Sequence, residues 1–284
     1  IELARRDATR SEATVQARIS QLLLTAPLNL SQEKVRLEAP VGGGHRIDVE
    51  VGTTVIEVKK DLRVGNVREE AEEQLTGYVA AREKRFGCRY VGVLSDGARW
   101  HCYHLQQGRL KEVSAFLLDS SRPDAAALLA WLEGVLATTE NVRPVPEAIV
   151  SGLGAGGSAH ALDLSALLTL FQEYKTKPEV QTKRLLWARL LAATFGTQFE
   201  DTDRLFVEHT LLVNSASVIA HALLGIPVQQ IPAASMLSGA KFEEAGIEGV
   251  IEADFFDWVL DAPKGDAFIQ TLARRLCRFD WSAV

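Results

Sequence analysis

The sequence is poor in cysteine. Its three cysteines, Cys88, Cys102 and Cys277, form no CxxC pair and have no histidine partners at zinc-ligand spacing. This pattern argues against a zinc site and against a small secreted fold held by disulfides. The cysteines are therefore interpreted as reduced, partly buried thiols of a cytoplasmic protein.

Long apolar segments are also lacking. No stretch reaches the roughly 18 apolar residues of a membrane span, so no membrane partner is expected. The first residues, IELARRDATR, lack the apolar centre of a secretory signal. Serine-hydrolase, P-loop and HExxH signatures are absent. The GLGAGG stretch at 152–157 has no buried strand before it, and the strand expected after a nucleotide-binding loop, with an acidic residue at its end, is also missing. A linker is therefore favoured over a nucleotide site.

Charge is unevenly distributed along the chain. The net charge is −6, but residues 1–120 hold 18 Lys and Arg against 17 Asp and Glu. The acidic excess therefore lies in the second part. A near-neutral first part is compatible with binding DNA, provided that its basic residues cluster on one face.

A length of 284 residues with 47% hydrophobic residues predicts a soluble protein of two domains. Hydrophobic periodicity predicts an α/β domain at 1–138, with a mixed central sheet flanked by helices, and an all-α domain at 162–284. The Pro-, Gly- and Ser-rich segment 139–161 is predicted to be a linker. In the first domain, helices are predicted at 11–24, 66–86 and 124–137, and strands at 36–40, 45–51, 53–60, 89–97 and 98–105. In the second, helices are predicted at 163–175, 179–195, 203–224, near 253–260 and at 265–276.

Acidic and basic residues converge on the hairpin at 45–60. Glu57 and Lys59 are two apart on a strand and so share a face, and Asp48 can face the same side from the preceding strand. Phosphodiester hydrolysis needs a divalent metal, an activated water and stabilisation of charge on phosphorus. Mg²⁺ prefers a few carboxylate oxygens and keeps several waters. Asp48 and Glu57 are therefore candidate metal ligands, and Lys59 is a candidate for positioning or activating water and countering phosphate charge.

The segments RID48 and VIE57VK59 resemble the PD-(D/E)xK nuclease superfamily, with Ile47 in place of the proline. This resemblance implies a PD-(D/E)xK-like fold, Asp48 and Glu57 as ligands of Mg²⁺, for which Mn²⁺ can substitute, and Lys59 as the catalytic lysine.

A second match is the QxxxY element formed by Gln74 and Tyr78, four residues apart on the next predicted helix. This element occurs in one branch of the superfamily. The resemblance implies that Gln74 and Tyr78 support the active site and contact the DNA backbone. An early-helix glutamate often completes the metal site in that branch, and Glu12 is the candidate here.

Other readings of these charges stay open. Short strings of acids and lysines are also frequent on exposed strands. Glu50 and Lys60 are predicted to lie on the opposite face of the hairpin as solvated charges, although Lys60 could also contact DNA. His209 and His221 are predicted to serve packing or helix capping.

The second part resembles the helical region that precedes the catalytic core in N6-adenine DNA methyltransferases fused to restriction nucleases, called type I-like or type IIG enzymes. LFVEHTLLV at 205–213 and FDW at 279–281 carry this resemblance. The chain has no Asn/Asp-Pro-Pro-Tyr/Phe motif and no S-adenosylmethionine loop, so that cofactor is expected only in a methyltransferase part outside the chain, and the chain is expected to be an N-terminal fragment.

Together these features predict a Mg²⁺-dependent endonuclease acting on double-stranded DNA within a restriction–modification enzyme. Because one such site cuts one strand, two copies are expected to associate transiently on DNA. The alternatives are a nuclease-like module that binds DNA or a partner without cleavage, and a part of a phage-defence methyltransferase.

Overall fold

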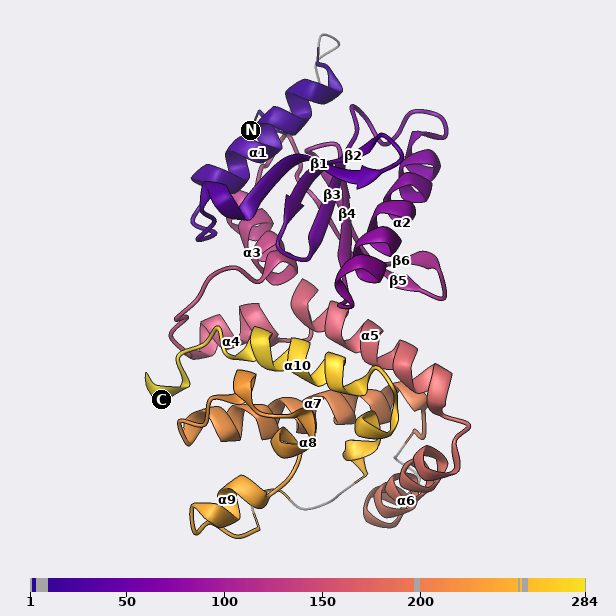
Figure 1. The fold of residues 1–284 in the computed structure, drawn as a ribbon, viewed down its shortest axis with the longest axis vertical. Coiled ribbons are helices and arrows are strands. Elements are labelled where there is room, and N and C mark those ends of the chain that lie inside the picture. Colours follow the sequence, from indigo (N-terminus) through magenta and orange to yellow (C-terminus); the bar gives the residue numbers. More distant parts are fainter. Residues whose placement is uncertain (1, 4–9, 197–199, 250, 252–254, 284) are drawn as a thin grey trace. The chain divides into compact units, whose positions relative to one another are not determined.

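The computed structural model describes residues 2–3, 10–196, 200–249, 251 and 255–283. The chain divides into two compact units. Unit 1 comprises Ile1–Thr139 and Ile149–Leu162, and unit 2 comprises Glu140–Ala148 and Asp163–Val284. Figure 1 shows strands in unit 1 and helices in both units.

Unit 1 is built on one six-stranded sheet whose strands lie in the order of the sequence. Neighbouring strands are antiparallel except β3 and β4, which are parallel. A parallel pair needs a long crossover, and α2 supplies it. The predicted α/β class, with a mixed sheet flanked by helices, is confirmed. The elements are α1 (Glu12–Thr25), β1 (Val35–Gly42), β2 (His45–Val51), β3 (Thr54–Val58), α2 (Val67–Phe86), β4 (Val91–Ser95), β5 (Arg99–Gln106), β6 (Arg109–Leu117) and α3 (Ala125–Leu136).

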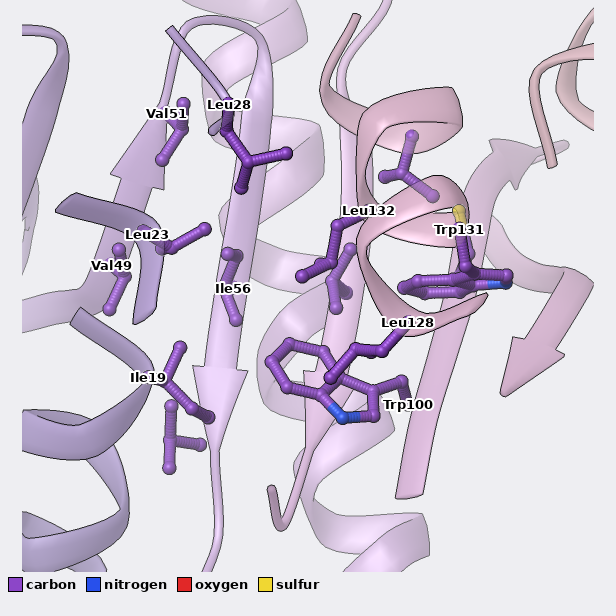
Figure 2. Packing of buried hydrophobic residues seen from close by; sticks show 14 of the residues in the cluster. Ile19, Leu23, Leu28, Val49, Val51, Ile56, Trp100, Leu128, Trp131 and Leu132 are labelled. Atoms are coloured by element: carbon purple, nitrogen blue, oxygen red, sulfur yellow. The ribbon is translucent and has the colours of Figure 1, made fainter. Parts of the chain in front are cut away.

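Helices cover both faces of the sheet, α1 and α3 on one face and α2 on the other (Figure 1). Ile19 and Leu23 of α1, Ile56 of β3 and Trp100 of β5 pack in one buried cluster with α3 (Figure 2). This burial follows from the apolar face of α1, where buried residues recur at helical spacing.

The α2 face has its own apolar cluster, and α2 lies very close to β4 there. A Cβ atom added to Gly92 would lie 3.0 Å from the side chain of Leu75 and 3.2 Å from that of Val79. Glycine at this strand position therefore allows close packing of the helix on the sheet.

Strand β6 was not predicted from the sequence. Most of its residues are exposed or half-buried, because it is the last strand of the sheet. An edge strand that buries few side chains carries a weak apolar alternation, so its sequence gives little signal.

Unit 2 is helical in all its regular structure among the described residues. Aromatic side chains form its centre, with Phe171, Trp187 and Trp258 all packed within reach of Phe206. The helices predicted at 179–195, 203–224 and 265–276 are confirmed to within a residue. The helical elements from residue 146 onward are α4 (Pro146–Leu153), α5 (Ser158–Tyr174), α6 (Pro178–Phe195), α7 (Asp203–Leu223), α8 (Ala233–Met236), α9 (Ala240–Glu244) and α10 (Gly265–Leu276), with 3-10 turns η3 (Val228–Gln230), η4 (Phe256–Asp261) and η5 (Trp281–Ala283).

Three sequence expectations differ from the structure. Most of the predicted linker 139–161 is helical, in α4 and the first turn of α5, where Oγ of Ser158 donates to the carbonyl of Trp131. The helix predicted near 253–260 is a 3-10 turn at Phe256–Asp261, and residues 253 and 254 lie outside the described residues. The short helices α8 and α9 were not predicted.

The described ranges contain no membrane-spanning helix and no disulfide. No helix there has both the length and the hydropathy needed to cross a membrane. In these ranges Cys88, Cys102 and Cys277 are thiols that form no disulfide; Cys102 is buried and the other two are half-buried.

Candidate active site

The site begins where β2 and β3 separate. Their pairing ends at Val49 and Ile56. Beyond this pair, Oδ2 of Asp48 accepts a hydrogen bond of 2.7 Å from the backbone N–H of Val58. The carboxylate of Asp48 therefore takes the place of a strand partner and lies between the two diverging strands.

The alternation of β2 is broken at Asp48. Ile47 packs in the α2-face cluster, whereas Val49 packs in the cluster on the α1 and α3 face. Two residues that strict alternation would place on one face thus lie on opposite faces. On the neighbouring strand β1, Glu38 has a positive φ of 50°. Both strands bend at this level, which turns Asp48 toward the gap.

Glu57 lies on the α2 face of β3 and is 1% exposed. Its Oε1 accepts a hydrogen bond of 2.6 Å from Nζ of Lys59. Its Oε2 is buried with no hydrogen-bond partner. Burial of a carboxylate oxygen without a partner is costly, so this atom marks a place where a ligand would be favourable.

Lys59 follows β3 directly, and its backbone N–H bonds the carbonyl of Ser95 at 2.9 Å. This bond extends the parallel pairing with β4 and fixes the start of the lysine side chain. Its Nζ also lies 3.4 Å from Oε1 of Gln74 and 3.6 Å from Oε1 of Glu12. Lys59 therefore contacts side chains of β3, α1 and α2.

Gln74 and Tyr78 extend the network along α2. They are one helical turn apart, and Nε2 of Gln74 donates to the hydroxyl of Tyr78 at 2.6 Å. A continuous hydrogen-bonded chain therefore runs from Glu57 through Lys59 and Gln74 to Tyr78.

The surroundings of the site raise the pKa of both carboxyls. Burial, followed by the charge of Asp48, raises the pKa of Glu57 from 4.5 to about 7. Burial also raises the pKa of Asp48, although the Val58 N–H opposes the shift. For Lys59, burial lowers the pKa, but the bond to Glu57 and the nearby acids outweigh it and raise the pKa above its ordinary value.

These features fit a divalent cation held by Asp48 and Glu57. A cation there would offset the repulsion between the two carboxyls and give the orphaned Oε2 of Glu57 a partner. Within the described ranges, no group of three or more His, Cys, Asp and Glu side chains is arranged around a common ion position. Two carboxylates suit Mg²⁺, which commonly binds one or two and keeps waters for the rest. Glu12 meets Lys59 rather than the two carboxyls, so its role as a ligand stays a prediction.

The prediction that Glu50 is a solvated charge is wrong. Glu50 is fully buried and pairs with Arg82 of α2 at 2.8 Å. It pairs across the strands with Val55, which packs under α2, so Glu50 lies on the same covered face as Glu57. Lys60 is exposed, as predicted, just beyond Lys59.

Two residues near the site were not predicted. Gln16 of α1 donates to the backbone carbonyl of Asp48 at 3.1 Å and to Oε1 of Glu38 at 2.8 Å. The only sequence signal for Gln16 is its position one turn after Glu12 on the same helix. The contact of Glu38 with Gln16 arises from the bend of β1, where Glu38 has a φ of 50°.

Both histidines that were predicted to serve packing lie against aromatic rings of unit 2. His221 packs on Phe242 and its Nδ1 lies 2.8 Å from the Ser217 carbonyl, while His209 packs on Trp187.

Comparison of the chain with protein families, with curated proteins and with solved structures found no match. What the site can do therefore follows from its own side chains.

Proposed function

We propose that unit 1 is a Mg²⁺-dependent DNA endonuclease of the PD-(D/E)xK type, in which Mn²⁺ can substitute. The observation that supports this proposal most strongly is the meeting of Asp48, Glu57 and Lys59 where β2 and β3 separate, with one buried carboxylate oxygen left without a partner.

Each residue has a distinct role in the proposed reaction. Asp48 and Glu57 would hold the cation, which when bound supplies Lewis-acid stabilisation and lowers the pKa of water. The raised pKa of Lys59 keeps its Nζ protonated near neutral pH. Lys59 therefore orients water and offsets negative charge on the phosphate rather than removing a proton. Gln74 and Tyr78 hold the ammonium group in place and can donate to a phosphate oxygen.

Metal binding can be tested without cleavage. Adding Mg²⁺ or Mn²⁺ is expected to stabilise unit 1, by about 1.4 kcal/mol when the metal is at ten times its Kd. Asp48→Asn and Glu57→Gln are expected to abolish this gain, whereas Glu112→Gln, on the edge strand β6, should keep it. The midpoint of thermal unfolding with and without metal measures the effect. If the metal raises the unfolding midpoint equally in all variants, Asp48 and Glu57 do not bind it.

Basic residues flank the site at one end of the sheet. Because β2 and β3 are antiparallel, the residues before Asp48 and those after Val58 lie at the same end of this strand pair. Arg46, at the tip of the β1–β2 hairpin, and Lys60 are both exposed there. Two exposed cations beside an acidic metal site suit a polyphosphate backbone.

Replacing Arg46 and Lys60 together by alanine is expected to weaken DNA binding about tenfold. In a plot of log affinity against log salt concentration, the slope should become shallower by about one for each phosphate contact that is lost. Lys84→Ala is the control, because Lys84 is exposed but ten residues past Gln74, about 15 Å along α2. Fluorescence anisotropy with labelled duplex DNA in EDTA measures both quantities. An unchanged salt dependence in the double variant would contradict this surface.

In this proposal, unit 2 is the helical connector of a cytoplasmic restriction–modification enzyme. The support is the resemblance of residues 205–213 and 279–281. S-adenosylmethionine and the choice of DNA sequence would belong to parts outside the chain, and two copies would meet on DNA to cut both strands. A module that binds DNA without cleavage would keep the affinity but show no Mg²⁺-dependent nicking.

A further inference from the structure

A second charged pair lies under α2, outside the proposed metal site. Glu50 of β2 is 0% exposed and Arg82 of α2 is 3% exposed. Nη2 of Arg82 contacts Oε2 of Glu50 at 2.8 Å. Arg36 of β1, whose side chain is half-exposed, contacts the other oxygen of Glu50 at 3.2 Å.

The pair is linked to the proposed site through one stripe of α2. Gln74, Tyr78 and Arg82 are spaced four apart, so they lie on one side of the helix. At one end of this stripe, Gln74 contacts Lys59, and at the other end Arg82 contacts Glu50. Glu50 is two residues from Asp48 on the same strand. The ion pair therefore ties α2 to the strand that carries one candidate metal ligand.

The energetics favour a geometric role for this pair. Burying two charges costs desolvation that their attraction often only balances, so apolar residues of similar size would hold the layers together as well. Apolar contacts, such as those of Leu75 and Val79 with Gly92, do not by themselves fix the position of α2 along its own axis, because a shifted helix can pack apolar side chains as well. The ion pair does, because Nη2 of Arg82 lies within hydrogen-bond distance of Oε2 of Glu50, at 2.8 Å, at only one position of α2 along β2. A slip of one helical turn would move Gln74 by about 5.4 Å.

We propose that Glu50 and Arg82 are positioning residues: their buried ion pair fixes α2 on the sheet and so holds Gln74 and Tyr78 against Lys59. This inference rests on the proposed nuclease function for its catalytic consequence, but not for its structural one. The pair takes no part in the reaction itself.

The test compares Arg82→Met and Arg82→Lys with Arg36→Met in the full chain. Arg36→Met is the matched control, because it removes the other partner of Glu50 and leaves α2 attached. Arg82→Met is expected to lower kcat for Mg²⁺-dependent plasmid nicking about ten- to a hundredfold, with KM changed less than twofold, because the active-site groups are misplaced while the DNA surface is intact. Arg82→Lys keeps the charge and should recover part of kcat. The kcat of Arg36→Met should stay within about twofold of the kcat of the unaltered chain, a much smaller change than the one expected for Arg82→Met.

A second measurement is independent of cleavage. The chain has four tyrosines, so ring signals in ¹³C-tyrosine NMR can be assigned, with Tyr78→Phe identifying Tyr78. Arg82→Met should move the Tyr78 signal, Arg36→Met should leave it in place, and Tyr174 in unit 2 serves as the internal reference. Because Arg82→Met can also impair folding, Arg82→Lys is measured in parallel, and circular dichroism checks that each variant is folded.

The outcomes separate the two proposals. If Arg82→Met and Arg36→Met give the same kcat and the same Tyr78 signal, the positioning role is wrong. If the unaltered chain nicks no DNA, the nuclease proposal fails, while a displaced Tyr78 signal in Arg82→Met would still support the structural role. An unmoved Tyr78 signal in a folded Arg82→Met overturns it.

Discussion

Lys59→Ala is expected to lower the rate of Mg²⁺-dependent DNA cleavage by about a hundred- to a thousandfold. The change removes the one ammonium that contacts Glu57, Glu12 and Gln74 together. Removal of a single preorganised donor at the reacting centre commonly has an effect of this size. Asp48→Ala should be at least as damaging, because it takes away a candidate metal ligand and the partner of the Val58 N–H.

Nicking of supercoiled plasmid by the unaltered chain and by the Lys59→Ala variant, over a range of Mg²⁺ concentrations, measures this effect. Lys84→Ala is the control, since Lys84 is an exposed lysine of α2 that lies ten residues past Gln74. A Lys59→Ala protein that cuts DNA at the unaltered rate would remove the catalytic assignment.

Glu57→Gln is expected to abolish cleavage and, without metal, to make unit 1 more stable above neutral pH. The pKa of Glu57 is about 7 in the folded chain, raised by burial and then by Asp48, against an ordinary value of 4.5. As pH rises from 4.5 to 7, the unfolded chain releases this proton first, so the folded state binds more protons and its stability falls. The loss is complete above pH 7 and amounts to roughly 3 kcal/mol. Glutamine carries no charge at any pH, so the Glu57→Gln variant does not lose this stability.

The free energy of unfolding of both proteins in EDTA at pH 5 and pH 8 tests this result. Hydrogen exchange at the amides of β3 and β4 reports on unit 1 separately. The advantage of Glu57→Gln should appear at pH 8 and shrink toward pH 5. In the Asp48→Asn background the advantage should be smaller, because one cause of the raised pKa is gone. If Glu57→Gln is more stable by the same amount at both pH values, the pKa of Glu57 is not raised by burial and by Asp48.

Much of the α/β unit could be predicted from local pattern. The hairpin of β2 and β3 was visible in its alternating β-branched residues and in Gly52, which has a positive φ of 56° in the turn. Helix α2 was visible in the spacing of Ala71, Leu75 and Val79, all fully buried. Spacing two apart was enough to place Glu57 and Lys59 on one side of a strand.

What could not be predicted depends on contacts between residues far apart in the sequence. Glu50 is buried because Arg82, 32 residues later, meets it under α2, and no local pattern contains that pairing. The change of faces at Asp48, between Ile47 and Val49, depends on a bend shared with β1. The short helices α8 and α9 depend on packing within unit 2. Periodicity describes one element at a time, whereas burial of charge is decided by its neighbours.

The most direct test of the central claim is X-ray anomalous diffraction from crystals of the chain grown with Mn²⁺. The carboxylates of Asp48 and Glu57 carry the proposal, and Oε2 of Glu57 lacks a partner. A single strong anomalous peak in contact with both carboxylates, absent in Glu57→Gln crystals, is the predicted result. Manganese bound elsewhere, with Lys59 still bonded to Glu57 and the space beside Asp48 empty at saturating metal, would contradict it.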